Sequence, residues 1–395
     1  MKPEALYIVG RISALGSRPL LILLLKHFSG NTAAVSIATV FIVLALSLAI
    51  SGFDSHRNFY KAYFAKKRKR GIKKLYANFI SSVVFQILIL ILPIVGFFIF
   101  TQKGILIGLA AALYFASERL ADESQRFLIF KTSRSEWGLR IFVKFLIQTV
   151  GVLLVCSSLT STDSVFLGSL AALTLGNMVG YIKCVNVRYF PCRLKDILEG
   201  CRQSMVQANY WVLSMLTTSI TYLDRIVVMI LNQADVAVFT LVVSSLSLTQ
   251  NFVEYFYLSF HRASMLQGKL SFGGIFMQGK IYFVIGSGLL VGVVLCVIMV
   301  KIYDAQHFNL GLILPMVVIS QVAIAATLLA REIAYWALPP RHMIIIESSF
   351  FLIAVLSITA LHALGYSYVH VLALLSLLYV IRVVAFATRA KQINI

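Results

Sequence analysis

The sequence is poor in charged residues, and it is poorest in acidic ones. Charged residues make up 13% of the chain and hydrophobic residues 59%, and 35 Lys and Arg stand against only 15 Asp and Glu. A soluble globular domain has about a quarter of its residues charged. The composition therefore excludes an ordinary soluble domain, and it leaves a surplus of positive charge to be explained.

Motifs for catalysis or metal binding are also absent. No glycine-rich phosphate loop is followed by Lys-Ser or Lys-Thr, and no HExxH sequence occurs. The five cysteines form no CxxC pair, and three of them, Cys184, Cys192 and Cys201, lie in one hydrophilic gap. Metal and redox motifs need closely spaced ligands, so we predict neither a metal site nor a bound cofactor.

What the chain has in abundance is long apolar stretches. Twelve can be recognised, each near the ~20 residues that a helix needs to cross ~30 Å of hydrocarbon. Because lipid offers no hydrogen-bond partner to an open backbone, we expect each stretch to be a helix. The predicted fold class is therefore an all-α polytopic membrane protein with 12 transmembrane helices. The stretches are 5–28, 33–52, 77–101, 104–120, 139–158, 163–182, 208–231, 236–258, 281–301, 308–330, 343–363 and 367–388.

The basic residues orient these helices. Most Lys and Arg fall in alternate hydrophilic gaps and at the two termini, whereas the other gaps hold only Lys26, Lys103 and Lys301. Basic loops remain in the cytoplasm, so both termini are predicted to be cytoplasmic. The basic run 66–70 is then a topology anchor that also attracts anionic lipids. The net charge of +20 needs no nucleic-acid partner to explain it.

The gap at 184–207 divides the chain into two lobes of six helices, residues 1–183 and 208–395. The lobes share a weak likeness, because Ala45-Leu46-Ser47-Leu48 corresponds to Ser245-Leu246-Ser247-Leu248. Each lobe has an even number of spans and starts inside, so the two would be parallel repeats, as in several transporter folds. The gap itself has helical spacing, which makes it a candidate for a helix on the membrane surface.

Five basic residues lie inside predicted spans. A charge at the bilayer centre costs at least ~2.5–3.5 kcal/mol, so such a residue usually faces a partner or a water-filled cavity. Arg18 lies ~20 Å along its helix, whereas Arg11 and Lys144 are within about two turns of the cytoplasmic edge. For the neighbours Asp224 and Arg225 the alternatives are internal ion pairing or an anion-binding cavity, where phosphate suits the guanidinium fork. The five are Arg11, Arg18, Lys144, Arg225 and Arg382.

The end of the fourth span carries a charged face. It contains Glu118, Arg119, Glu123 and Arg126, and Arg119 and Glu123 stand at i and i+4. One interpretation is a solvated helix end held by salt bridges. The other is a cytoplasmic gate at the mouth of a cavity, and the sequence leaves both open.

The region around the seventh span resembles a known family. Tyr222-Leu223-Asp224-Arg225, followed by a short turn and a small-residue and aromatic start to span eight, is similar to the start of the second half in polysaccharide transporters. These belong to the multidrug/oligosaccharidyl-lipid/polysaccharide (MOP) exporter superfamily. The 12-span layout with both ends inside resembles most the Wzx-type flippases of O-antigen and capsule repeat units. The chain departs from the pattern in having Val238-Phe239 where the family often has Gly-Tyr, and it lacks the two extra spans of the lipid II flippase branch.

The resemblance implies a V-shaped pair of six-helix lobes with a central cavity lined by spans one, two, seven and eight. It implies transport of an undecaprenyl-pyrophosphate-linked oligosaccharide across a bacterial inner membrane by alternating access. A polysaccharide polymerase and a chain-length regulator are candidate partners. The candidate substrate-binding residues are Arg18, Arg225, Arg11 and Lys144. The candidates for charge balance or for coupling to a proton or sodium gradient are Glu254, Asp224 and Asp54.

Two alternative functions remain open. A drug or metabolite antiporter of the same fold should need an acidic, aromatic cavity for cations, and the deep charges here include at least as many Arg as acids. A membrane enzyme of polysaccharide assembly generally carries large periplasmic loops, and the predicted outer gaps are only a few residues long. Sugar-transferase genes beside this one would favour the flippase.

The predicted topology can be tested by chemical accessibility. In a cysteine-free variant, Asn31→Cys and Thr162→Cys should react with a membrane-impermeant thiol reagent applied from outside, because both lie in weakly charged outer gaps. Arg68→Cys should stay unlabelled until the membrane is opened, because its basic loop is cytoplasmic. Labelling of Arg68→Cys from outside would overturn the assignment of the two sides.

Overall fold

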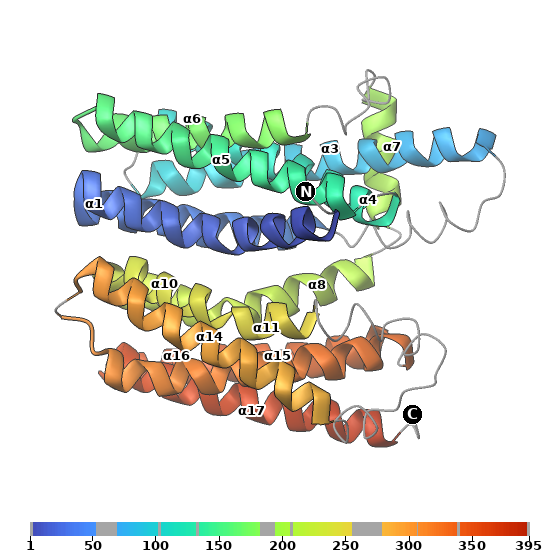
Figure 1. Cartoon of the computed structure of the whole chain (residues 1–395). Coiled ribbons are helices and arrows are strands. Elements are labelled where there is room, and N and C mark those ends of the chain that lie inside the picture. Colours follow the sequence, from blue (N-terminus) through green and yellow to red (C-terminus); the bar gives the residue numbers. More distant parts are fainter. Residues whose placement is uncertain are drawn as a thin grey trace. The chain divides into compact units, whose positions relative to one another are not determined.

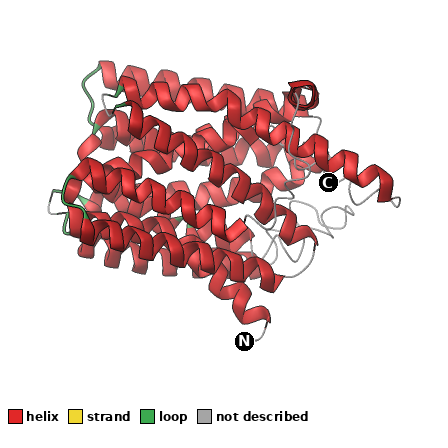
Figure 2. Cartoon of the chain, turned by 90° about the horizontal axis from the view of Figure 1, so that it is seen from above, coloured by secondary structure: helices red, strands yellow, loops and turns green. Residues whose placement is uncertain are grey.

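The structure, a computed structural model, describes residues 3–52, 69–101, 104–131, 134–181, 194–205, 208–254, 279–305, 307–337 and 340–392. Within these ranges every regular element is a helix and no strand occurs (Figures 1 and 2). The predicted class, an all-α polytopic membrane protein, is confirmed.

The helices follow the order of the predicted spans. Helix α1 carries the first two apolar stretches, while α8 with α9, and α10 with α11, each make up one further stretch. Helix α7 lies in the predicted gap between the lobes and is helical, as its residue spacing predicts. The bounds are α1 Pro3–Gly52, α3 Lys69–Phe100, α4 Ile105–Lys131, α5 Arg134–Ser158, α6 Thr162–Tyr181, α7 Leu194–Met205, α8 Ala208–Thr221, α9 Leu223–Leu231, η2 Gln233–Asp235, α10 Val236–Leu246, α11 Leu248–Phe252, α14 Gly279–Tyr303, α15 Leu310–Ala337, α16 Pro340–Ala363 and α17 Tyr368–Gln392.

Seven helices of the described part are long and apolar enough to cross a membrane, and the bent pair α8–α9 raises the number to eight. The number is below the predicted twelve partly because α1 counts once although it breaks at Gly30, and because α10 and α11 are separated at Ser247. Large apolar side chains such as Leu92, Phe100 and Leu356 are exposed. Such exposure is expected of helices that face lipid tails rather than water.

Helix α1 breaks at Gly30. This residue has φ 85° and ψ −177°, outside the helical region, and helix continues on both sides of it. Glycine adopts a positive φ without strain because it has no Cβ. The break falls between the first two predicted spans, 5–28 and 33–52, so α1 consists of two helices joined by a very short turn.

By its internal contacts the chain divides into two compact units, and the first is residues 1–215. In this unit α5 packs against α1 and α6, and α4 packs against α3 and α6. Helix α5 approaches α1 where Gly138 faces Gly10, and it approaches α6 where Gly176 lies against Gln148 and the Lys144 carbonyl. Small residues allow membrane helices to pack closely. The close packing places the polar side of α5 beside α6.

The second unit is residues 216–395. Helix α17 packs against α15 and α16, and α14 packs against α10 and α11. Its buried core includes Ile220, Val227, Phe350 and Tyr379. Helices α8 and α9 meet at an angle of 54° on either side of Tyr222. The boundary between the units lies inside α8, a few residues after the predicted gap at 184–207.

The positive φ of Gly30 predicts that alanine is tolerated less well at this position than at a helical glycine. Gly30→Ala should destabilise the protein by about 1–3 kcal/mol, because a φ of 85° with a ψ near 180° is almost restricted to glycine. Open space surrounds the position of the new Cβ, so the cost is conformational rather than steric. Gly96→Ala in α3 is the matched control, because Gly96 has equal space and a helical backbone, and it should be neutral or stabilising. Equal unfolding midpoints for the two variants in detergent would contradict the strain.

Candidate functional site

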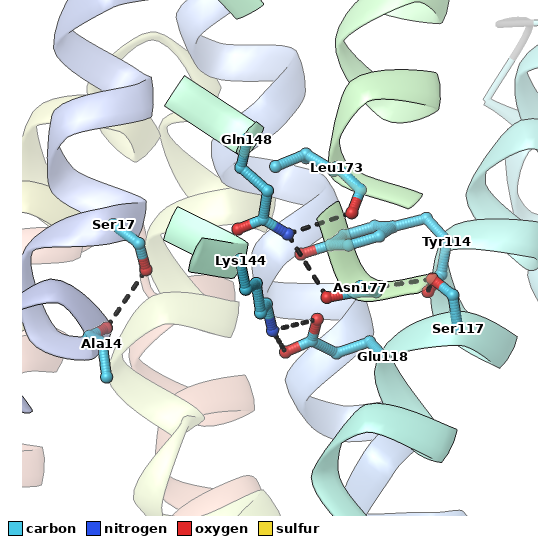
Figure 3. A network of polar contacts seen from close by, with 9 residues as sticks. All are labelled: Ala14, Ser17, Tyr114, Ser117, Glu118, Lys144, Gln148, Leu173 and Asn177. Atoms are coloured by element: carbon cyan, nitrogen blue, oxygen red, sulfur yellow. Dashed lines mark hydrogen bonds and ion pairs between the residues drawn. The ribbon is translucent and has the colours of Figure 1, made fainter. Parts of the chain in front are cut away.

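An ion pair joins α4 to α5 inside the first unit. Lys144 Nζ lies 2.8 Å from Glu118 Oε2 and 3.0 Å from Glu118 Oε1. Each side chain is 13% exposed, so the pair is mostly buried but is not sealed (Figure 3). Sequence analysis assigned Lys144 to the substrate and Glu118 to the gate. The structure places the two side chains against each other.

Neutral polar groups surround this pair. Asn177 of α6 donates to Ser117 Oγ at 2.9 Å, and Gln148 of α5 donates to Asn177 Oδ1 at 3.3 Å (Figure 3). Gln148 also donates to the Leu173 carbonyl at 3.0 Å, and the Asn177 side chain lies beside the Glu118 carboxylate. Sequence analysis missed both amides, because their only signal is a polar side chain within an apolar span. Such groups usually find partners on neighbouring helices.

Arg18 of α1 adds a second positive charge. It is half-buried, and its guanidinium carbon lies 5.6 Å from the centre of the Phe41 ring. A guanidinium over an aromatic face is a favourable contact. The charge of Arg18 also acts on Glu118. Arg18, Glu118, Lys144, Gln148 and Asn177 are called the first-unit cluster below, and these five residues include two cations and one carboxylate.

Two residues of the charged face at the end of α4, Arg119 and Glu123, are buried. Arg119 Nη1 lies 2.5 Å from Glu123 Oε1, which confirms the predicted i,i+4 contact, and Arg119 Nη2 donates to Gln86 Oε1 of α3 at 2.8 Å. The side chains of Arg119 and Glu123 are 1% and 4% exposed. This part of α4 is therefore salt-bridged but not solvated. Helix α4 continues past Arg126 to Lys131, and the Arg126 side chain lies outside the described part.

In the second unit Asp224 contacts the backbone of Arg225, and the Arg225 guanidinium contacts the ring of Tyr222. Asp224 Oδ1 accepts a hydrogen bond from the Arg225 backbone N–H at 2.7 Å. This carboxylate lies in the first turn of α9, where the helix dipole favours a negative charge. The Arg225 guanidinium lies 4.3 Å from the centre of the Tyr222 ring. Among the described residues no group hydrogen-bonds its buried Nε.

A further buried ion pair, in the second unit, was not predicted as a site. Arg382 of α17 donates from Nη2 and Nε to the two carboxylate oxygens of Glu347 of α16, at 2.5 and 2.9 Å. Thr217 of α8 donates to Glu347 Oε1 at 3.0 Å. Sequence analysis noted Arg382 as a charge inside a span but did not connect it with Glu347. The pair is 1% and 0% exposed, so it is closed on all sides.

The remaining predicted site residues are only partly described. The position of Asp54 and the side chain of Arg11 lie outside the described residues. Glu254 is exposed and follows α11 in a short stretch of π-helix. That Arg18 and Arg225 face one water-accessible space stays a prediction, as do the gate and ion-coupling roles.

Comparisons with known proteins identify a solved structure with a similar fold, but no protein with a similar sequence. No family model and no curated protein matches the chain. Its structure is similar to that of a multidrug resistance MATE family transporter of the MOP superfamily, solved in an inward-facing conformation. The TM-score is 0.54 at 10% sequence identity, and the match covers 98% of this chain and 99% of the transporter. The chain therefore has the fold of a MOP-superfamily transporter, the fold that the sequence resemblance implied.

The burial of the Glu347–Arg382 pair predicts how substitutions there change the stability of the protein. Arg382→Met should destabilise the protein by about 3–5 kcal/mol, because it leaves the Glu347 charge buried without compensation. The double variant Glu347→Gln, Arg382→Met should recover most of this loss. Arg140→Ala is the control, because Arg140 and Glu136 form a partly exposed pair and such pairs contribute about 1 kcal/mol or less. The unfolding free energy measures all three, and a double variant no more stable than Arg382→Met would contradict the pairing argument.

Proposed function

We propose that this chain is a flippase of the bacterial inner membrane, with both termini in the cytoplasm. Its substrate would be an undecaprenyl-pyrophosphate-linked oligosaccharide, moved from the cytoplasmic to the periplasmic leaflet. The fold supports a membrane transporter. The observation that supports the choice of substrate is the basic character of the first-unit cluster, where the Glu118–Lys144 ion pair lies within electrostatic range of Arg18.

Two basic side chains close together within membrane spans favour an anionic ligand. Their combined positive charge attracts an anion strongly where little water screens it. A pyrophosphate group presents several charged oxygens within a small volume, and hydrogen bonds to charged groups are roughly twice as strong as neutral ones. Asn177 and Gln148 are 1% and 3% exposed and bond to each other, so they support the cluster from behind rather than contact the substrate.

Arg225 supports a second anionic contact. The Tyr222 ring covers one face of its guanidinium, and its buried Nε has no hydrogen-bond partner among the described residues. The planar edge of a guanidinium binds phosphate or carboxylate in a bidentate manner. We assign to Arg225 a contact with the pyrophosphate or with an acidic sugar of the substrate.

Alternating access would move the substrate. An ion can drive the exchange between inward-open and outward-open states only if its site differs in affinity between them. Asp224 is 2% exposed and Glu254 is exposed, so these two acids have very different surroundings. Asp224 and Glu254, together with Asp54, are the proposed groups for coupling to a proton or sodium gradient.

A cation exporter is the competing function, because the similar structure is a multidrug resistance transporter. The first-unit cluster argues against it, since Arg18 and Lys144 would repel a cation. An uptake assay with a cationic dye separates the two functions. A drug exporter should extrude the dye, whereas the proposed flippase should not.

Loss of either deep arginine should abolish export. In a strain that lacks its own flippase, Arg18→Ala and Arg225→Ala should produce no surface polysaccharide while protein levels stay near normal. Arg→Lys at each position should restore export only in part, because Lys keeps the charge but loses the bidentate fork. Arg140→Ala, at a partly exposed pair of the same protein, is the control and should export normally. A fall in protein level that matches the loss of export would instead support a purely structural role for the arginines.

A further inference from the structure

Glu118 occupies the place on Lys144 that an anionic substrate would take. Both of its carboxylate oxygens contact Lys144 Nζ, at 2.8 and 3.0 Å. These are the distances of charge-assisted hydrogen bonds from an ammonium to any anionic oxygen, including that of a phosphate. Lys144 cannot keep both contacts to Glu118 and also give its full set of donors to a second anion.

The burial of this pair sets it apart from the Glu347–Arg382 pair, which also joins two helices in the described part of the chain. The Glu347–Arg382 pair is 0% and 1% exposed and has Thr217 as a third partner. The Glu118–Lys144 pair is 13% exposed on both sides. It also has Arg18 within electrostatic range. The Glu347–Arg382 pair is closed to solvent, whereas the Glu118–Lys144 pair is partly exposed.

Glu118 also has an alternative partner when Lys144 is withdrawn. The Asn177 side chain lies beside its carboxylate, and Arg18 acts on it from α1. Gln148 holds Asn177 in turn, by a hydrogen bond to Asn177 Oδ1. A carboxylate released by Lys144 would therefore remain compensated inside the unit.

We propose that Glu118 is an internal competitor of the substrate: it holds Lys144 in the empty transporter and gives it up to the diphosphate group when the substrate binds. The inference rests on the proposed function. It assigns to Glu118 the role of lowering the affinity of the site for its anionic substrate. The pair avoids a bare ammonium group within the membrane spans of the empty protein. It also weakens binding, because only the fraction of molecules with a released Lys144 can bind fully. A transporter gains from this, since a diphosphate held too tightly would not be released.

The test measures binding of inorganic pyrophosphate to the full chain in lipid nanodiscs by calorimetry. Glu118→Gln should bind about tenfold more tightly than the natural chain, if about a tenth of the natural molecules have a released Lys144. Lys144→Met should bind more weakly. The double variant should bind no more tightly than Lys144→Met, because the gain acts through Lys144. Empty Glu118→Gln should melt at a lower temperature, and pyrophosphate should restore more of its stability than in the natural chain.

Two controls make the result specific. Glu136→Gln removes an acid of the same unit from the partly exposed pair with Arg140, and it should leave the affinity unchanged. A tighter double variant would show that net charge, rather than release of Lys144, causes the gain, and it would overturn the inference. If Glu118→Gln does not accumulate, Glu118→Asp replaces it, because the shorter carboxylate lengthens the contact and should shift the affinity in the same direction.

The outcomes separate the inference from the proposed function. Pyrophosphate binding by the natural chain that is equal or weaker in Glu118→Gln means that Glu118 positions Lys144, so the inference fails while the flippase stands. If neither the natural chain nor any variant binds pyrophosphate, the protein has no such anion site. The competitor role of Glu118 and the proposed flippase function then both fail. Binding seen only in Glu118→Gln supports the competitor role in its strongest form.

Discussion

A charge within a membrane needs a partner, and the helix contacts of this protein follow from that constraint. Lipid tails are as apolar as the outer faces of the helices, so apolar burial alone does not decide which helices become neighbours. Polar contacts do so here. Glu347 and Arg382 connect α16 to α17 and reach α8 through Thr217. Lys144 connects α5 to α4 through Glu118.

The same constraint produces two kinds of ion pair. The pair of Glu347 with Arg382 has two hydrogen bonds between its partners and is 0% and 1% exposed, so it holds helices in one arrangement. The pair of Glu118 with Lys144 is partly exposed and lies within electrostatic range of Arg18. The chemical groups are alike. If Glu118 competes with the substrate as proposed, exposure and neighbouring charge decide whether a pair only connects helices or also exchanges partners.

The sequence predicts the helices well because their signal is local. Apolar length places the spans, and the i,i+4 spacing of Arg119 and Glu123 predicts their contact without knowledge of any other helix. Contacts between helices depend on the rotation and depth of each helix, which a uniformly apolar span does not specify. For this reason the sequence predicts a gate role for Glu118 and a substrate role for Lys144, and gives no sign that the two side chains form an ion pair. The break at Tyr222 also had no sequence signal, because neither Gly nor Pro marks it.

The break at Gly30 bears on how the chain first enters a membrane. The helix before it carries Arg11 and Arg18, and each would cost at least ~2.5–3.5 kcal/mol near the bilayer centre. The helix after it, from residue 31 to residue 52, has no charged residue at all. Because the connecting turn is so short, we expect the two to leave the ribosome and the translocon as one helical hairpin. The uncharged second helix would then supply the hydrophobicity that lets the arginine-bearing first helix insert and stay inserted during synthesis.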